Sequence, residues 1–159
     1  MISVNSNDEL IKKILNSSKV IAMVGVSFIK KEDANNVKRR PSTIVMKYLQ
    51  EFGYRVIPVN PSAEGKEIYG EKVVANLEDI KEPIDIVDVF RPSKEATEIA
   101  KQAIKIKAKV LWLQYGIQND EAKTIVEKCN INYIANKCIK QEYQRLFLKV
   151  SPVFPALKN

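Results

Sequence analysis

Apolar residues along the chain alternate between short continuous runs and longer stretches with helical spacing. The continuous runs predict strands that are buried on both faces, as in a parallel sheet, and they cover residues 19–26, 55–59, 84–90, 109–113 and 131–135. Helical spacing predicts helices over 6–15, 42–52, 93–103, 119–129 and 139–150, with a shorter one at 77–80. This alternation predicts an α/β fold, a Rossmann-type doubly wound parallel sheet of about five strands with helices on both faces. Right-handed crossovers then give the expected strand order 3-2-1-4-5.

Capping residues and a proline set the expected ends of these elements. Ser6-Asn-Asp-Glu9 has the pattern of a capping box and predicts the start of the first helix. Ser93 and Asn119 are expected to cap the helices that follow them. Pro58 lies inside the second strand, which indicates that this strand pairs incompletely. The helix that opens at Pro41-Ser42 is expected to bury one face, formed by Ile44, Val45, Tyr48, Leu49 and Phe52.

Length and charge bound the class of protein. With 159 residues, the chain is expected to form one domain over 1–159. No apolar run spans a bilayer and the N-terminus lacks a signal core, so we expect a cytoplasmic protein with no membrane partner. The formal charge of +7 fits either a solvated basic surface or an anionic partner. The basic residues are spread out with no aromatic-interleaved patch, which argues against nucleic acid.

The residue types that are missing exclude several chemistries. The chain contains no histidine, which removes histidine acid–base catalysis, histidine metal ligation and phosphohistidine intermediates. Cys129 and Cys138 have no zinc-site or CxxC spacing, so we expect no metal site. Lys137 and Lys140 flank Cys138, which would suit a reactive thiolate in a redox or acyl-carrying role; a buried structural cysteine is the alternative.

The turn after the first strand, Val24-Gly-Val-Ser27, is the main candidate site. A dinucleotide-binding fold usually has GxGxxG here, directly opening a helix. This chain keeps only Gly25, Ser27 stands at the second glycine position, and the helix waits until Ser42. A small-residue turn and a helix N-terminus still suit a phosphate, and Arg40 could pair with it bidentately. The alternative is an ordinary strand, turn and helix with a capping serine.

The ends of the next strands lie at the same edge of the expected sheet. NAD proteins usually have an acid after the second strand for the ribose hydroxyls, whereas this chain has Asn60-Pro61 there. The missing acid favours a ribose that carries a phosphate, as in NADP or coenzyme A, although Asn60-Pro61 could also be a plain turn. Phe90 could pack on an adenine and Arg91 could reach a phosphate, or they could be a core residue and a surface charge. Trp112 is expected in the core.

In combination, several segments resemble a known family. They are Val24–Ser27, Arg40–Ser42, Gly53–Pro61, Ile84–Arg91, Lys109–Gln114 and Asn136–Cys138. These segments resemble the small stand-alone CoA-binding domain proteins, which are relatives of the N-terminal nucleotide-binding domain of the succinyl-CoA synthetase α subunit. The resemblance implies a Rossmann-type fold and non-covalent coenzyme A binding. By position it implies Gly25, Val26, Ser27, Arg40 and Ser42 around the phosphates, Asn60 and Pro61 near the ribose, and Phe90 and Arg91 at the next strand end. Two departures are the long charged loop before Arg40 and Ile139, where the family usually has proline.

We therefore expect a module that binds CoA or acyl-CoA without catalytic machinery of its own. Ligase activity by this chain alone is excluded, because the ligase relatives use a phosphorylated histidine in a further domain. An NADP-dependent oxidoreductase, or a redox or acyl-carrying protein using Cys138, is the alternative. A homo-oligomer or an acyl-CoA enzyme would be a fitting protein partner.

Overall fold

The computed structural model describes residues 2–27 and 41–149, and within them a parallel sheet of five strands. Its strands are β1 (Val20–Val24), β2 (Arg55–Val59), β5 (Ile86–Val89), β6 (Val110–Leu113) and β7 (Asn132–Ile134). The α-helices are α1 (Ile2–Ser17), α2 (Pro41–Glu51), α3 (Ala96–Lys105), α4 (Asp120–Lys128) and α5 (Ile139–Tyr143). A π-helical turn, Gln144–Leu148, continues α5. The predicted α/β class is confirmed.

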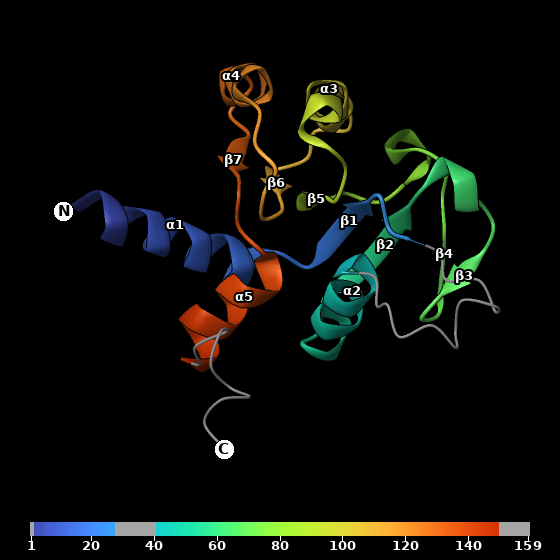
Figure 1. The fold of residues 1–159 in the computed structure, drawn as a ribbon, viewed down its shortest axis with the longest axis horizontal. Helices are drawn as coiled ribbons and strands as arrows, with labels where there is room; N and C mark the ends of the chain where they lie inside the picture. The colour runs from blue at the N-terminus through green and yellow to red at the C-terminus, as the bar shows by residue number, and fades with distance from the viewer. Residues whose placement is uncertain (1, 28–40, 150–159) are drawn as a thin grey trace.

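The order of the strands across the sheet differs from the prediction. The order is β2-β1-β5-β6-β7, so the second and third long strands lie on opposite sides of β1. The segment between them forms two short 3-10 turns (Pro61–Ala63 and Leu77–Asp79) and the small hairpin of β3 (Glu67–Ile68) and β4 (Glu71–Lys72). A bridge from Val59 to Val74 places this segment along the outer edge of β2 (Figure 1). Because that edge is covered, the chain returns to the free edge of β1, which gives the other common doubly wound order.

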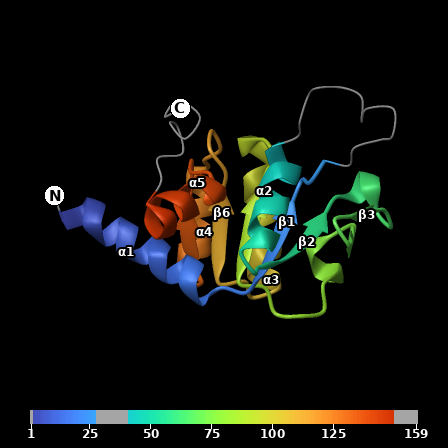
Figure 2. The same cartoon turned by 90° about the horizontal axis from the view of Figure 1, so that it is seen from below.

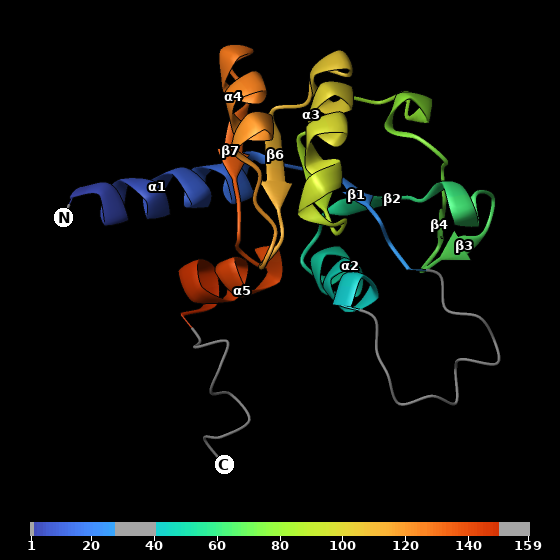
Figure 3. The ribbon, with the colours of Figure 1, turned by 45° about the horizontal axis from the view of Figure 1, so that its top comes forward.

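Helices cover both faces of the sheet, as predicted. One core cluster joins α1, α2 and α5 to side chains that include Met23, Ile86 and Trp112. The other joins α3 and α4 to the opposite face, where Ala22 and Val87 lie. Figure 3 shows α3 and α4 on one side of the strands and α2 and α5 on the other, and Figure 2 views the fold from below, with α2 in front of β1. Trp112 is fully buried in the first cluster, as expected for a core residue.

Several predicted element ends need correction. The first helix begins at Ile2, so Ser6 lies within α1 rather than at its N-terminus. Ser93 lies in a 3-10 turn, Ser93–Glu95, and its hydroxyl accepts a hydrogen bond from the backbone of Gln118 instead of capping α3. Asn119 does cap α4, because its side chain accepts from the Ala122 N–H at 2.9 Å.

The buried face of α2 is rotated from the predicted one. The residues that α2 buries are Ser42, Thr43, Val45, Met46 and Leu49. Ile44 and Phe52 are partly exposed instead, at 37% and 40%. Small polar residues take the inner positions at the start of the helix because its N-terminus meets the turn after β1, where Ser42 is a hydrogen-bond partner.

Pro58 lies in an edge strand. β2 pairs with β1 over its full length, from Val20 opposite Arg55 to Val24 opposite Val59. On the other side, Pro58 only accepts a hydrogen bond from the Val74 N–H, so its missing N–H costs no ladder bond. None of the helices in the described part of the chain is long and apolar enough to cross a membrane.

Candidate functional site

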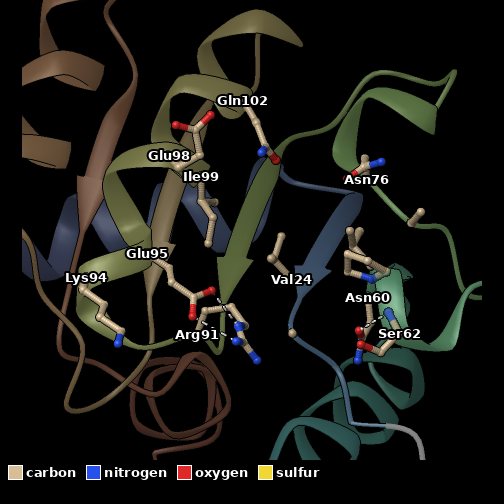
Figure 4. Close-up of a pocket in the computed structure, with 14 residues that line it drawn as sticks. Val24, Asn60, Ser62, Asn76, Arg91, Lys94, Glu95, Glu98, Ile99 and Gln102 are labelled. Atoms are coloured by element: carbon tan, nitrogen blue, oxygen red, sulfur yellow. Dashed lines mark hydrogen bonds and ion pairs between the residues drawn. The ribbon is translucent and has the colours of Figure 1, made fainter.

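A cavity of about 520 Å³ opens at the carboxyl ends of β1, β2 and β5, against the first turns of α3 (Figure 4). This is the edge at which doubly wound sheets bind ligands, and the volume lies in the range of small-molecule sites. We call it the nucleotide cavity. Its walls include Val24, Gly25, Asn60, Pro61, Ser62, Asn76, Arg91, Lys94, Glu95, Glu98, Ile99 and Gln102.

Gly25 can only be glycine in this turn. Its φ is +95°, in the left-handed region that side chains disfavour, and an added Cβ would lie 2.7 Å from Cδ of Arg91 and 3.1 Å from the carbonyl oxygen of Phe90. The single glycine of the broken dinucleotide fingerprint therefore lets the Arg91 side chain cross the end of β1.

Asn60 ties the end of β2 to the turn after β1. Its Nδ2 donates to the carbonyl oxygen of Val26 at 2.8 Å, and its Oδ1 accepts from the Ser62 N–H at 2.9 Å. Val26 itself is fully buried. The absence of an acid at residue 60 thus also has a structural reason. A carboxylate could not donate a hydrogen bond to the carbonyl oxygen of Val26, whereas the Asn60 amide does.

Ser27 and Ser42 connect the same turn to the start of α2. The backbone N–H of Ser27 donates to Oγ of Ser42 at 3.0 Å, and Ser42 is only 3% exposed. These predicted site residues are therefore in contact, in a supporting arrangement beneath the helix N-terminus. Arg40 lies outside the described residues.

The guanidinium of Arg91 lies in the wall of the nucleotide cavity and is paired with a carboxylate. Its Nε and Nη2 donate to the two carboxylate oxygens of Glu95, both at 2.9 Å. The bond to Glu95 raises the pKa of Arg91, and the reciprocal bond lowers the pKa of Glu95. The Arg91 side chain is 44% exposed, so its bidentate pair with Glu95 is weak enough for an anionic ligand to compete for the guanidinium.

Phe90 does not share the cavity of Arg91. Successive residues of a strand point to opposite faces, and Phe90 lines a second cavity of about 630 Å³ between α2 and α5. Cys138 lines this second cavity too and is partly buried. The predicted site residues therefore divide: Gly25, Asn60, Pro61 and Arg91 line the nucleotide cavity, Phe90 lines the second one, and Val26, Ser27 and Ser42 hold the turn beside them.

Sequence analysis missed the α3 wall of the nucleotide cavity. Glu95, Glu98 and Gln102 line it, one helical turn apart on the side of α3 beside its buried alanines. Their three- and four-residue spacing, which places them on one side of a helix, was the available signal. No group of three or more potential metal-ligating side chains occurs among residues 2–27 and 41–149.

Asp88 is a buried carboxyl that the sequence analysis also passed over. It lies in the middle of β5 between Met23 and Trp112 and is fully buried. Neither of its carboxylate oxygens has a hydrogen-bond partner in the described structure, and burial raises its pKa well above the usual range. An acid inside an apolar strand was the signal. Asp88 lines neither cavity and bears on stability.

Comparison with known proteins identifies the family. The model of the CoA binding domain family matches residues 19–144. The chain belongs to this CoA-binding domain family. It is 39% identical over 136 residues to the Bacillus subtilis (strain 168) protein YneT, a match that covers 86% of this chain and 93% of that one.

Solved structures of similar sequence share the fold. The structure of cell-free ID.343 from Thermus thermophilus has a TM-score of 0.77 at 37% identity, covering 88% of this chain and 98% of that chain. A hypothetical protein from Pyrococcus horikoshii OT3 has the same TM-score at 42% identity, covering 87% and 91%. The suspected resemblance to small stand-alone CoA-binding domain proteins is thus confirmed.

Proposed function

We propose that this member of the CoA-binding domain family binds coenzyme A in the nucleotide cavity, as a binding module without catalytic machinery of its own. The observation that carries the proposal is the close approach of Gly25 to Arg91 over a cavity of about 520 Å³ at the ligand-binding edge of the sheet. Family membership selects coenzyme A among the phosphorylated nucleotides that such a cavity could take.

The residues present fit the parts of coenzyme A. The turn at Gly25 would face the phosphates, since it lines the cavity at the carboxyl end of β1. Arg91 would add a charge-assisted bond after leaving Glu95. Glu98 and Gln102 line the far wall, where a carboxylate or amide oxygen can accept from the amino group of adenine. Glu98 would therefore lie at the adenine end, whereas Glu95 is the carboxylate that Arg91 must leave to meet a phosphate.

Coenzyme A is preferred over NAD because residue 60, after the second strand, is an amide whose polar atoms already make hydrogen bonds within the protein. Both polar atoms of Asn60 are engaged with Val26 and Ser62, so Asn60 offers no carboxylate to a ribose diol. The absence of histidine removes the phosphohistidine chemistry of ligases. We propose that the chain holds CoA or acyl-CoA for use elsewhere.

Calorimetric titration with CoA, 3′-dephospho-CoA, NADP and NAD tests this function. We expect CoA to bind more tightly than either nicotinamide nucleotide, and NADP binding tighter than CoA would overturn the proposal. Arg91→Gln should weaken CoA binding about threefold to tenfold. The variant loses one charge-assisted hydrogen bond to the ligand, but it also no longer has to break the Arg91–Glu95 pair on binding. Arg55→Gln is the matched control, since Arg55 is also ion-paired, with Glu71 and Glu82, but begins β2 at the opposite edge of the sheet.

A further inference from the structure

The second cavity differs in chemistry from the nucleotide cavity. Its volume is about 630 Å³, and its walls include the apolar side chains of Val45, Phe90 and Ile117 together with Gln114 and Cys138. No charged side chain from the described part of the chain lines it. The described wall residues offer no counter-charge to an anion or a cation, so this wall suits an uncharged, mostly apolar group.

Gln114 brings a hydrogen-bond donor to this apolar wall. It is only 5% exposed, and its Oε1 accepts from the Ile139 N–H at 3.2 Å. Its Nε2 donates to no described residue, so the amide donor is available to a ligand in the cavity. A ligand oxygen inside the cavity would satisfy this donor.

Two neighbouring residues at the end of β5 line one cavity each. Phe90 lines the second cavity and its neighbour Arg91 lines the nucleotide cavity, while Gly25 lies against both residues. A ligand whose nucleotide lies on one side of this strand end can therefore pass its other end to the opposite side. Free CoA ends in a thiol and would leave the apolar walls uncovered.

We propose that the second cavity holds the acyl group of an acyl-CoA, with Nε2 of Gln114 donating to the thioester carbonyl oxygen. The proposal rests on CoA binding at the nucleotide cavity and narrows the ligand to thioesters of uncharged acyl groups. A dicarboxylic acyl group such as succinyl is disfavoured, because its free carboxylate would meet no cation among the described residues of the cavity wall.

Titration with CoA and with straight-chain acyl-CoA thioesters of increasing length tests the apolar walls. Affinity should rise by about threefold to fourfold for each methylene that becomes buried, until the cavity is filled. Succinyl-CoA should bind no better than CoA. If all thioesters bind equally to CoA or more weakly, CoA binding stands and the acyl cavity is refuted; if CoA does not bind at all, the proposed function itself fails.

The carbonyl contact is tested separately by S-alkyl-CoA thioethers of the same chain length, which lack the carbonyl oxygen. The thioester should bind about threefold to tenfold more tightly than its thioether, the usual effect of one hydrogen bond. Gln114→Glu keeps the acceptor for the Ile139 N–H but removes the amide donor, so it should abolish this difference. An undiminished difference would exclude the role of Gln114.

A size variant locates the acyl group. Ile117→Ala enlarges the cavity at a half-buried side chain and leaves the backbone bonds of Ile117 to Gln114 and Asn136 intact. It should move the best-bound chain to a greater length. Val74→Ala shortens a β-branched side chain on the far side of β2 and should leave the preferred length unchanged. An unmoved optimum in Ile117→Ala would overturn the placement.

Discussion

Replacing Gly25 by alanine perturbs the turn in two separable ways. The left-handed backbone, with φ of +95°, costs an L-residue about 1–2 kcal/mol. The new Cβ would also meet Arg91 Cδ at 2.7 Å, so the arginine must move and give up its exposed pair with Glu95, which is worth at most about 1 kcal/mol. We expect Gly25→Ala to lower the free energy of unfolding by about 1–3 kcal/mol.

Gly53 provides the matched control, because its φ of +97° carries the same backbone strain and its Cβ would meet nothing within 4 Å. Gly53→Ala should cost about 1–2 kcal/mol, and thermal unfolding should show each kcal/mol as roughly 2–4 °C for a chain of this size. CoA titration should show a loss of about threefold to tenfold for Gly25→Ala, the same as for Arg91→Gln, since Arg91 is displaced, and no loss for Gly53→Ala. Equal CoA affinities of the two variants would refute the role assigned to this close approach.

Three further changes test single features. Glu95→Gln removes the carboxylate that occupies Arg91, so CoA affinity measured by calorimetry should rise severalfold; a fall would show that Glu95 itself holds the ligand. Asp88 has a raised pKa, so the native state keeps its proton above pH 4, and stability should fall with rising pH by up to about 1.4 kcal/mol per unit until the folded pKa is passed. Asp88→Asn should remove that fall in urea unfolding at several pH values, and an unchanged pH profile would contradict the assignment. Asn119→Ala removes the cap on the Ala122 N–H and should cost about 1 kcal/mol in the same assay, while no change would show that the cap is not stabilising.

The periodic apolar pattern was sufficient to predict the class and the strands. Continuous runs such as the one in β6 are buried on both faces, and the alanine-rich face of α3 matches its helical spacing. The strand order was not readable in this way, because it depends on where the hairpin of β3 and β4 packs. That packing rests on a backbone bridge between Val59 and Val74, which leaves no trace in hydropathy.

The candidate site was predictable at positions where the turn after a strand accepts only a few residue types. Gly25 and Asn60 could be singled out because a turn after a strand admits few alternatives. The division of Phe90 and Arg91 between two cavities follows from strand alternation and could have been read from the sequence. The free donor of Gln114 could not, because it depends on α5 supplying the Ile139 N–H to only one of its polar atoms.

The covered edge of β2 also bears on how the protein behaves at high concentration. An open sheet edge offers unpaired backbone groups to the strands of another molecule. Along β2, Pro58 has no N–H to offer, its carbonyl is taken by Val74, and the Asn60 N–H is in turn bonded to the Val74 carbonyl. The edge next to the nucleotide cavity is thus protected against fibril-like stacking, and the short strand β7 at the other end of the sheet presents only three residues to a neighbour.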